Sequence, residues 1–137
     1  MKPSELVKGI DSCPCGKSHK CPIDFVKIGK NATDALPTLC EGYSSILLVS
    51  DENTYKACAG RVEALISEKI QKSLVLSSNA DVVIPNEEKI SEIESMLTDK
   101  TDLIIGVGSG VINDLCKYVS HKNALPYYIV ATAPSMD

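Results

Sequence analysis

The chain has 137 residues, enough for one ordinary domain that can bury a core without disulfide bonds. Its hydrophobic fraction of 44% and charged fraction of 23% exclude disordered and fibrous classes. A net charge of −4 argues against nucleic acid as a partner, and the longest apolar runs are far shorter than the ~20 residues of a membrane-spanning helix.

The beginning of the sequence contains no apolar stretch of signal-peptide length, so export is not expected. Six cysteines occur in a chain larger than disulfide-dense secreted domains. We therefore expect reduced thiols in a cytoplasmic protein. The sequence stops after a predicted strand and its following loop, which predicts that it is part of a longer protein.

Residues 1–24 are predicted to form a short helix followed by a Cys-rich knuckle, and residues 25–137 an α/β domain. The knuckle gathers four possible soft-metal ligands, namely Cys13, Cys15, His19 and Cys21. Zinc is therefore conceivable there. C-x-C followed by H-x-C is not a usual zinc spacing, however, so an ordinary turn is the competing interpretation.

Apolar runs and amphipathic segments alternate along the rest of the chain. The run Ser45–Ser50 is continuously apolar at its centre, which is typical of a strand buried on both faces of a parallel sheet. Strands are predicted over 25–28, 45–50, 73–76, 82–84, 102–105 and 127–130, and helices over 31–41, 54–69, 86–97 and 111–119. Pro37 predicts a kink or a late helix start. The alternation predicts a Rossmann-like parallel sheet flanked by helices.

Three glycines fall in the segment Gly106–Gly110, predicted to be a turn between a buried strand and a helix. Glycines there let the backbone approach a ligand, and a helix N-terminus attracts an anion such as a phosphate. The spacing is G-x-G-x-G, not the G-x-G-x-x-G of the dinucleotide fingerprint, and no P-loop motif is present. A tight turn without a ligand is the alternative interpretation.

Polar residues also follow two of the predicted strands. Asp51 comes at a strand's carboxyl end, where it can accept hydrogen bonds from a ribose or, equally well, offset a helix dipole. Here the acid precedes the glycine segment, whereas the usual dinucleotide order is the reverse. Thr132–Asp137 follow the last strand and should lie at the same edge of the sheet.

Together these motifs resemble a known family. Asp51 after ILLVS, then GVGSGVINDLCKYVSHK and LPYYIVATAPSMD, closely resemble the amino-terminal half of bacterial-type sn-glycerol-1-phosphate dehydrogenases. These enzymes belong to the iron-containing alcohol dehydrogenase and dehydroquinate synthase-like superfamily. The knuckle CPCGKSH is similar to the start of the same enzymes. The resemblance spans nearly the whole chain and explains why the acid comes before the glycines.

The resemblance implies reversible hydride transfer between NAD or NADP and a phosphorylated ketone, with dihydroxyacetone phosphate giving sn-glycerol 1-phosphate. It implies that Asp137 contacts the polyol substrate. The cofactor-binding residues that it implies are Asp51, Gly108, Gly110, Val111, Ile112, Asn113, Asp114, Thr132, Ala133, Pro134 and Ser135. Preference for NADH or NADPH stays open.

The resemblance also implies a helical carboxyl-terminal domain, absent from this chain, whose Asp and two His residues hold a catalytic zinc or nickel ion. No catalytic residue or catalytic metal ligand is assignable here, so this piece alone should bind nucleotide without turnover. The alternatives are glycerol or another polyol dehydrogenase of the superfamily, a non-catalytic nucleotide-binding module, and a metal-binding adaptor acting through the knuckle. A homodimer is possible.

Overall fold

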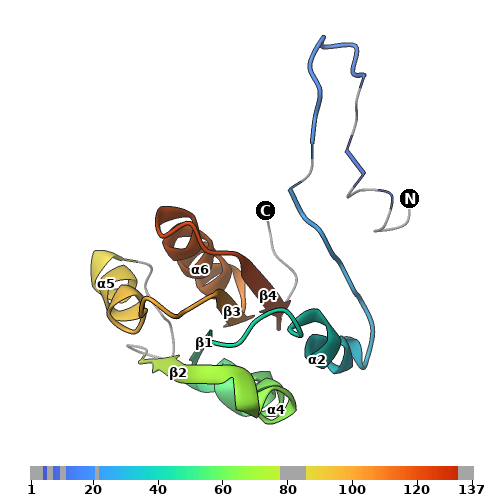
Figure 1. Cartoon of the computed structure of the whole chain (residues 1–137). Coiled ribbons are helices and arrows are strands. Elements are labelled where there is room, and N and C mark those ends of the chain that lie inside the picture. The colour runs from blue at the N-terminus through green and yellow to red at the C-terminus, as the bar shows by residue number, and fades with distance from the viewer. Residues whose placement is uncertain (1–4, 6–7, 10–11, 21, 78–85, 133–137) are drawn as a thin grey trace. The chain divides into compact units, whose positions relative to one another are not determined.

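The computed structural model describes residues 5, 8–9, 12–20, 22–77 and 86–132 (Figure 1). The chain forms two compact units, residues 1–32 and 33–137, and each is described by itself. No helix among the described residues is long and apolar enough to cross a membrane.

The first unit has no buried side chain among its described residues. The strand predicted over 25–28 is wrong, since residues 22–28 take no regular secondary structure. Phe25, Val26 and Ile28 are exposed. An extended segment needs a partner strand to satisfy its backbone groups, and no described strand pairs with this one. The predicted N-terminal helix falls largely outside the described residues.

The helix predicted over 31–41 is divided into two short elements. A 3₁₀ turn, η1 (Ala32–Ala35), is followed by the α-helix α2 (Leu36–Leu39). Pro37 lies in the first turn of α2, where its missing N–H removes no helical hydrogen bond. The late start that Pro37 predicts is confirmed.

Among the described residues of the second unit, four parallel strands form a sheet in the order β2-β1-β3-β4 (Figure 1). The strands are β1 (Ile46–Asp51), β2 (Ile70–Leu76), β3 (Leu103–Gly108) and β4 (Tyr127–Ala131). Val49 of β1 lies opposite Gly106 of β3, which in turn lies opposite Ile129 of β4. The predicted parallel sheet flanked by helices is therefore confirmed, while the strand predicted over 82–84 lies outside the described residues.

Helical segments connect successive strands. The helix predicted over 54–69 is irregular and ends before β2, which begins three residues earlier than predicted. Its pieces are α3 (Glu52–Thr54), the π-helical η2 (Tyr55–Ala59), α4 (Gly60–Leu65) and the 3₁₀ turn η3 (Ser67–Lys69). Beyond β2 come α5 (Glu87–Ser95) and α6 (Gly110–Lys122), close to their predicted positions.

The core occupies both faces of the sheet. Alternate residues of a strand point to opposite faces, so Leu47 and Leu48 of β1 contribute to different layers. One layer packs against α5 and α6 and contains Ile93, Ile112, Leu115, Cys116 and Val119. The other packs against α2 and α4 and contains Leu36, Cys40, Val62 and Ile66. Figure 1 shows the two helical layers on opposite sides of the strands.

The glycine turn predicted over 106–110 is wrong in its first half, because β3 continues through Gly108. A Cβ atom on Gly106 would lie 2.8 Å from the Sγ of Cys116, and one on Gly108 would lie 2.5 Å from the Cγ1 of Ile112. Both glycines therefore let α6 pack directly on the strand backbone. Of the three, only Gly110 has open space where a side chain would be.

Candidate nucleotide-binding site

The carboxyl ends of β1, β3 and β4 lie side by side at one edge of the sheet. This arrangement brings together Asp51 at the end of β1, Gly108 at the end of β3 and Thr132 after β4. The backbone N–H of Thr132 donates to the carbonyl oxygen of Gly108 at 3.0 Å. The predicted positions Ala133, Pro134, Ser135 and Asp137 lie outside the described residues.

The N-terminus of α6 opens at this edge without a side-chain cap. Ser109 is the N-cap residue, but its hydroxyl makes no capping hydrogen bond. Its carbonyl oxygen accepts from the N–H of Asn113 at 3.0 Å. The N–H groups of Gly110, Val111 and Ile112 have no acceptor among the described residues. Free N–H groups at the positive end of a helix dipole are suited to an anion such as a phosphate.

Two buried polar side-chain atoms lack a partner among the described residues. One is the Oδ1 of Asn113, in the first turn of α6, and the other is the hydroxyl of Ser50, next to Asp51. Buried polar atoms are nearly always hydrogen-bonded, so an orphan is a group that a ligand can satisfy. A flip of the Asn113 amide lets it offer an oxygen or an N–H. The remaining predicted contact on α6, Asp114, is exposed.

Asp51 has a structural role at the start of α3. Its Oδ1 accepts from the N–H of Thr54 at 2.7 Å, while its own N–H donates to the Oγ1 of Thr54 at 3.0 Å. Asp51 thus lies at the N-terminus of a helix, where the alternative interpretation placed it, and it also caps that helix. Capping does not compete with a ligand role, because no described residue donates to the second carboxylate oxygen, Oδ2.

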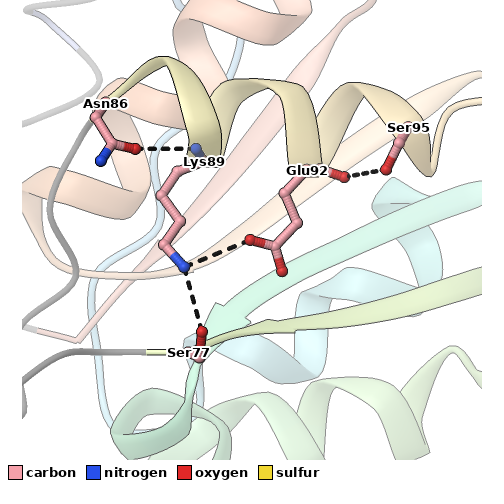
Figure 2. A network of polar contacts seen from close by, with 5 residues as sticks. All are labelled: Ser77, Asn86, Lys89, Glu92 and Ser95. Atoms are coloured by element: carbon pink, nitrogen blue, oxygen red, sulfur yellow. Dashed lines mark hydrogen bonds and ion pairs between the residues drawn. The ribbon is translucent and has the colours of Figure 1, made fainter.

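The sequence analysis did not identify Lys89, whose side chain lies near the carboxyl end of β2, as a residue of this edge. The ammonium of Lys89 lies 3.3 Å from the hydroxyl of Ser77 and 3.4 Å from a carboxylate oxygen of Glu92 (Figure 2). Ser77 directly follows Leu76, which is opposite Asp51 in the sheet. Asn86 fixes this part of α5, since its side chain accepts from the N–H of Lys89 at 3.0 Å. The Lys-x-x-Glu spacing was the available sequence signal.

The knuckle residues lie together in the first unit. The ligand atoms of Cys13, Cys15 and His19 are all within 4.8 Å of one another. The Sγ of Cys15 is 3.1 Å from the Nε2 of His19. Hydrogen bonds to the backbone and thiol of Cys15 lower the pKa of Cys13. The fourth predicted ligand, Cys21, lies outside the described residues.

The thiols of the second unit have a different environment. Cys40 and Cys116 are buried in the two core layers, and Cys58 is half-buried. Burial raises the pKa of Cys116 to about 12. Core packing therefore accounts for Cys40 and Cys116.

The second unit is therefore a Rossmann-like α/β unit. At the carboxyl edge of its sheet it presents the uncapped N-terminus of α6 together with Asp51. The model of the iron-containing alcohol dehydrogenase family matches residues 27–137, and the chain belongs to this family.

Curated relatives carry more specific names. The chain is 28% identical over 131 residues to the NAD(P)+ glycerol-1-phosphate dehydrogenase of Halalkalibacterium halodurans, covering 91% of this chain and 33% of the relative. It is 33% identical over 124 residues to the enzyme of that name from Methanosphaerula palustris, covering 88% of this chain and 33% of the relative. The chain thus spans about a third of the length of these relatives.

Solved structures share the fold. Glycerol dehydrogenase from Schizosaccharomyces pombe matches 74% of this chain and 25% of its own, with a TM-score of 0.60 and 23% identity. A 2-deoxy-scyllo-inosose synthase matches 76% of this chain and 31% of its own, also with a TM-score of 0.60 but with 10% identity. At these identities the likeness concerns the fold alone.

Proposed function

We propose that this chain is the cofactor-binding part of an NAD(P)-dependent sn-glycerol-1-phosphate dehydrogenase, which reduces dihydroxyacetone phosphate to sn-glycerol 1-phosphate. Family membership and the names of the relatives support the class of reaction. The observation that carries the proposal is the uncapped N-terminus of α6, which lies at the carboxyl edge of the sheet together with Asp51.

In this proposal each polar group at the edge has a defined partner on the nucleotide. The free N–H groups of Gly110–Ile112 hold the pyrophosphate, and the Oδ2 of Asp51 accepts from a ribose hydroxyl. The amide of Asn113 satisfies its orphaned atom on the ligand. Asp114 and Thr132–Ser135 line the nucleotide, Gly108 lets α6 approach the strand, and Asp137 contacts the polyol.

The bound nicotinamide supplies the hydride that reduces the ketone. The residues of this chain bind and orient that cofactor, and Asp51 holds its ribose while capping α3. A zinc or nickel ion would polarise the ketone oxygen, and none of the described edge residues forms a cluster suited to it. Since the relatives are about three times as long, we assign the metal and most of the substrate pocket to the additional length of such a protein.

We further infer a preference for NADH over NADPH. A 2′-phosphate on the adenosine ribose would face the negative charge of Asp51. Lys89 contacts Ser77, the residue after the strand position opposite Asp51, but its charge is already paired with Glu92 at 3.4 Å. Glu92→Gln releases Lys89, so it should strengthen NADPH binding more than NADH binding in calorimetric titrations. Equal effects on both cofactors would contradict the inference.

The cofactor site is tested by titrating the chain with NADH and comparing Gly110→Glu with Gly110→Gln. A Cβ atom at this position meets no other atom within 4 Å, and Glu and Gln have the same shape, but only Glu places a negative charge at the free N–H groups. We expect Gly110→Glu to bind NADH about 10-fold more weakly than the Gln variant, because like charges ~4 Å apart repel appreciably near a surface. Equal affinities, or no binding by the wild type, would refute the assignment.

A glycerol dehydrogenase is the second candidate. The chain is 30% identical over 95 residues to glycerol dehydrogenase 1 of Schizosaccharomyces pombe. The two activities are separated by assaying a protein of the relatives' full length that carries this sequence. Faster reduction of dihydroxyacetone phosphate than of dihydroxyacetone supports the main proposal, the reverse supports glycerol dehydrogenase, and binding of NADH without turnover of either supports a non-catalytic module.

A further inference from the structure

The first unit poses a problem of stability. None of its described residues is buried, and its large apolar side chains Ile23, Phe25, Val26 and Ile28 are exposed. A segment that buries little apolar surface is held in one conformation by disulfide bonds, metal ions or binding to another surface. The cysteines described here are all free thiols. A bound metal ion would supply the constraint that these thiols do not supply as disulfide bonds.

The knuckle turn brings three soft donors together. The N–H of Gly16 donates to the carbonyl oxygen of Cys13 at 2.9 Å, which closes a tight turn around Cys15. Gly16 has a φ of +79°, a left-handed conformation that glycine adopts without strain. This turn keeps the thiols of Cys13 and Cys15 within 4.8 Å of each other and of a ring nitrogen of His19.

The distances are close to those of a tetrahedral zinc site. Zn–S bonds of about 2.3 Å and Zn–N bonds of about 2.0 Å place ligand atoms roughly 3.5–3.8 Å apart. In the knuckle the three ligand atoms lie within 4.8 Å of one another, with Cys15 and His19 at 3.1 Å. Small side-chain rotations are enough to bring all three donors into a common coordination sphere.

We propose that Cys13, Cys15 and His19 bind one Zn²⁺ ion, with a water molecule or a fourth donor completing the tetrahedron. Two thiolates and an imidazole form a soft donor set that favours zinc over magnesium or calcium. The ion cross-links the turn in a part of the chain whose described residues bury no side chain, so its role is structural. This proposal does not depend on NAD binding.

The test is a Zn²⁺ titration of the reduced full 137-residue chain, with bound metal measured after gel filtration. We expect one zinc per chain in the wild type and about 100-fold weaker binding in Cys15→Ser and His19→Ala. Cys58→Ser is the matched control, because Cys58 is a half-buried thiol of the second unit, and it should bind zinc like the wild type. Absence of zinc from the wild type, or equal binding by Cys15→Ser and His19→Ala, would overturn the proposal.

Cobalt substitution provides a second readout that does not depend on affinity. With Co²⁺ the wild type should show a thiolate-to-cobalt charge-transfer band and tetrahedral ligand-field bands, both reduced in Cys15→Ser. An octahedral spectrum without the charge-transfer band would contradict the donor set. Circular dichroism of each variant checks that the α/β unit is intact, which separates loss of the site from loss of the fold.

Discussion

The two units of the chain are stabilised in different ways. The second unit buries apolar residues on both faces of a parallel sheet, so packing determines its structure. The described part of the first unit buries nothing and owes its local order to a turn at Gly16 and to contacts between soft side chains. The hydrophobic pattern of a sequence is therefore informative about the second unit and misleading about the first.

The largest effect on the free energy of unfolding is expected where α6 packs most tightly on β3. Gly108→Val places a Cβ atom 2.5 Å from the Cγ1 of Ile112 and should lower the free energy of unfolding by about 3 kcal/mol, because α6 must move away from β3. Urea unfolding followed by circular dichroism measures this. Gly110→Ala, in open space at the start of the same helix, is the control and should not destabilise. Equal stability of the two variants would show that α6 does not pack on the strand backbone.

Removing the hydrogen bonds of Asp102 should have the next largest effect on the free energy of unfolding. Asp102 accepts hydrogen bonds from the N–H groups of Ser44 and Ser45 at 2.9 and 3.0 Å and joins the starts of β1 and β3. Removing both acceptors in Asp102→Ala should cost about 2 kcal/mol. The measurement is again the midpoint of urea unfolding, and a change below about 0.5 kcal/mol would mean that water replaces the carboxylate without loss.

The same carboxylate predicts a dependence on pH. Partial burial by itself would raise the pKa of Asp102, but the hydrogen bonds from Ser44 and Ser45 outweigh it and hold the pKa below its ordinary value. A lowered pKa stabilises the fold at pH values above the unfolded pKa of about 3.9, and this stabilisation is lost as the pH falls through the folded pKa. Acid titration should therefore narrow the stability difference between the wild type and Asp102→Asn. A constant difference down to about pH 2 would contradict this.

A helix cap of the second unit should have a smaller effect. Asn86→Ala removes the hydrogen bond from the N–H of Lys89 and should cost about 1 kcal/mol, measured by thermal unfolding (Figure 2). Asn86→Asp keeps an acceptor and is the control that should retain stability. The contrast with α6, whose N-cap Ser109 makes no such bond, is informative. Ser109→Ala should leave stability nearly unchanged, and a loss as large as that of Asn86→Ala would show that α6 is capped.

Most of the fold could be predicted because the central strands are buried on both faces. The apolar runs at 46–49 and 103–105 identify β1 and β3 directly. β2 lies at the edge of the sheet, and its first residues include the exposed Gln71 and Lys72, so its start resembled the end of a helix. The end of β3 was missed because Gly106 and Gly108 suggested a turn, although they serve helix packing.

The candidate site was predictable only in part. Asp51 and the start of α6 follow from the order of motifs, because strand ends meet at one edge of a parallel sheet. Lys89 could not be placed, since its contact with Ser77 depends on how α5 packs beyond β2. The strand predicted over 25–28 was wrong because an apolar run forms a strand only where a partner is available.

The smallest effect should come from an apolar residue of the first unit. Ile28 is 78% exposed, whereas Ile93 of α5 is fully buried. Ile93→Ala should lower stability by about 3 kcal/mol through the cavity it leaves, while Ile28→Ala should change it by less than about 0.5 kcal/mol. Urea unfolding of the two variants makes the comparison on one scale. A loss of unfolding free energy in Ile28→Ala close to that in Ile93→Ala would mean that the side chain of Ile28 is buried in solution. Apolar packing rather than a bound ion would then stabilise the first unit.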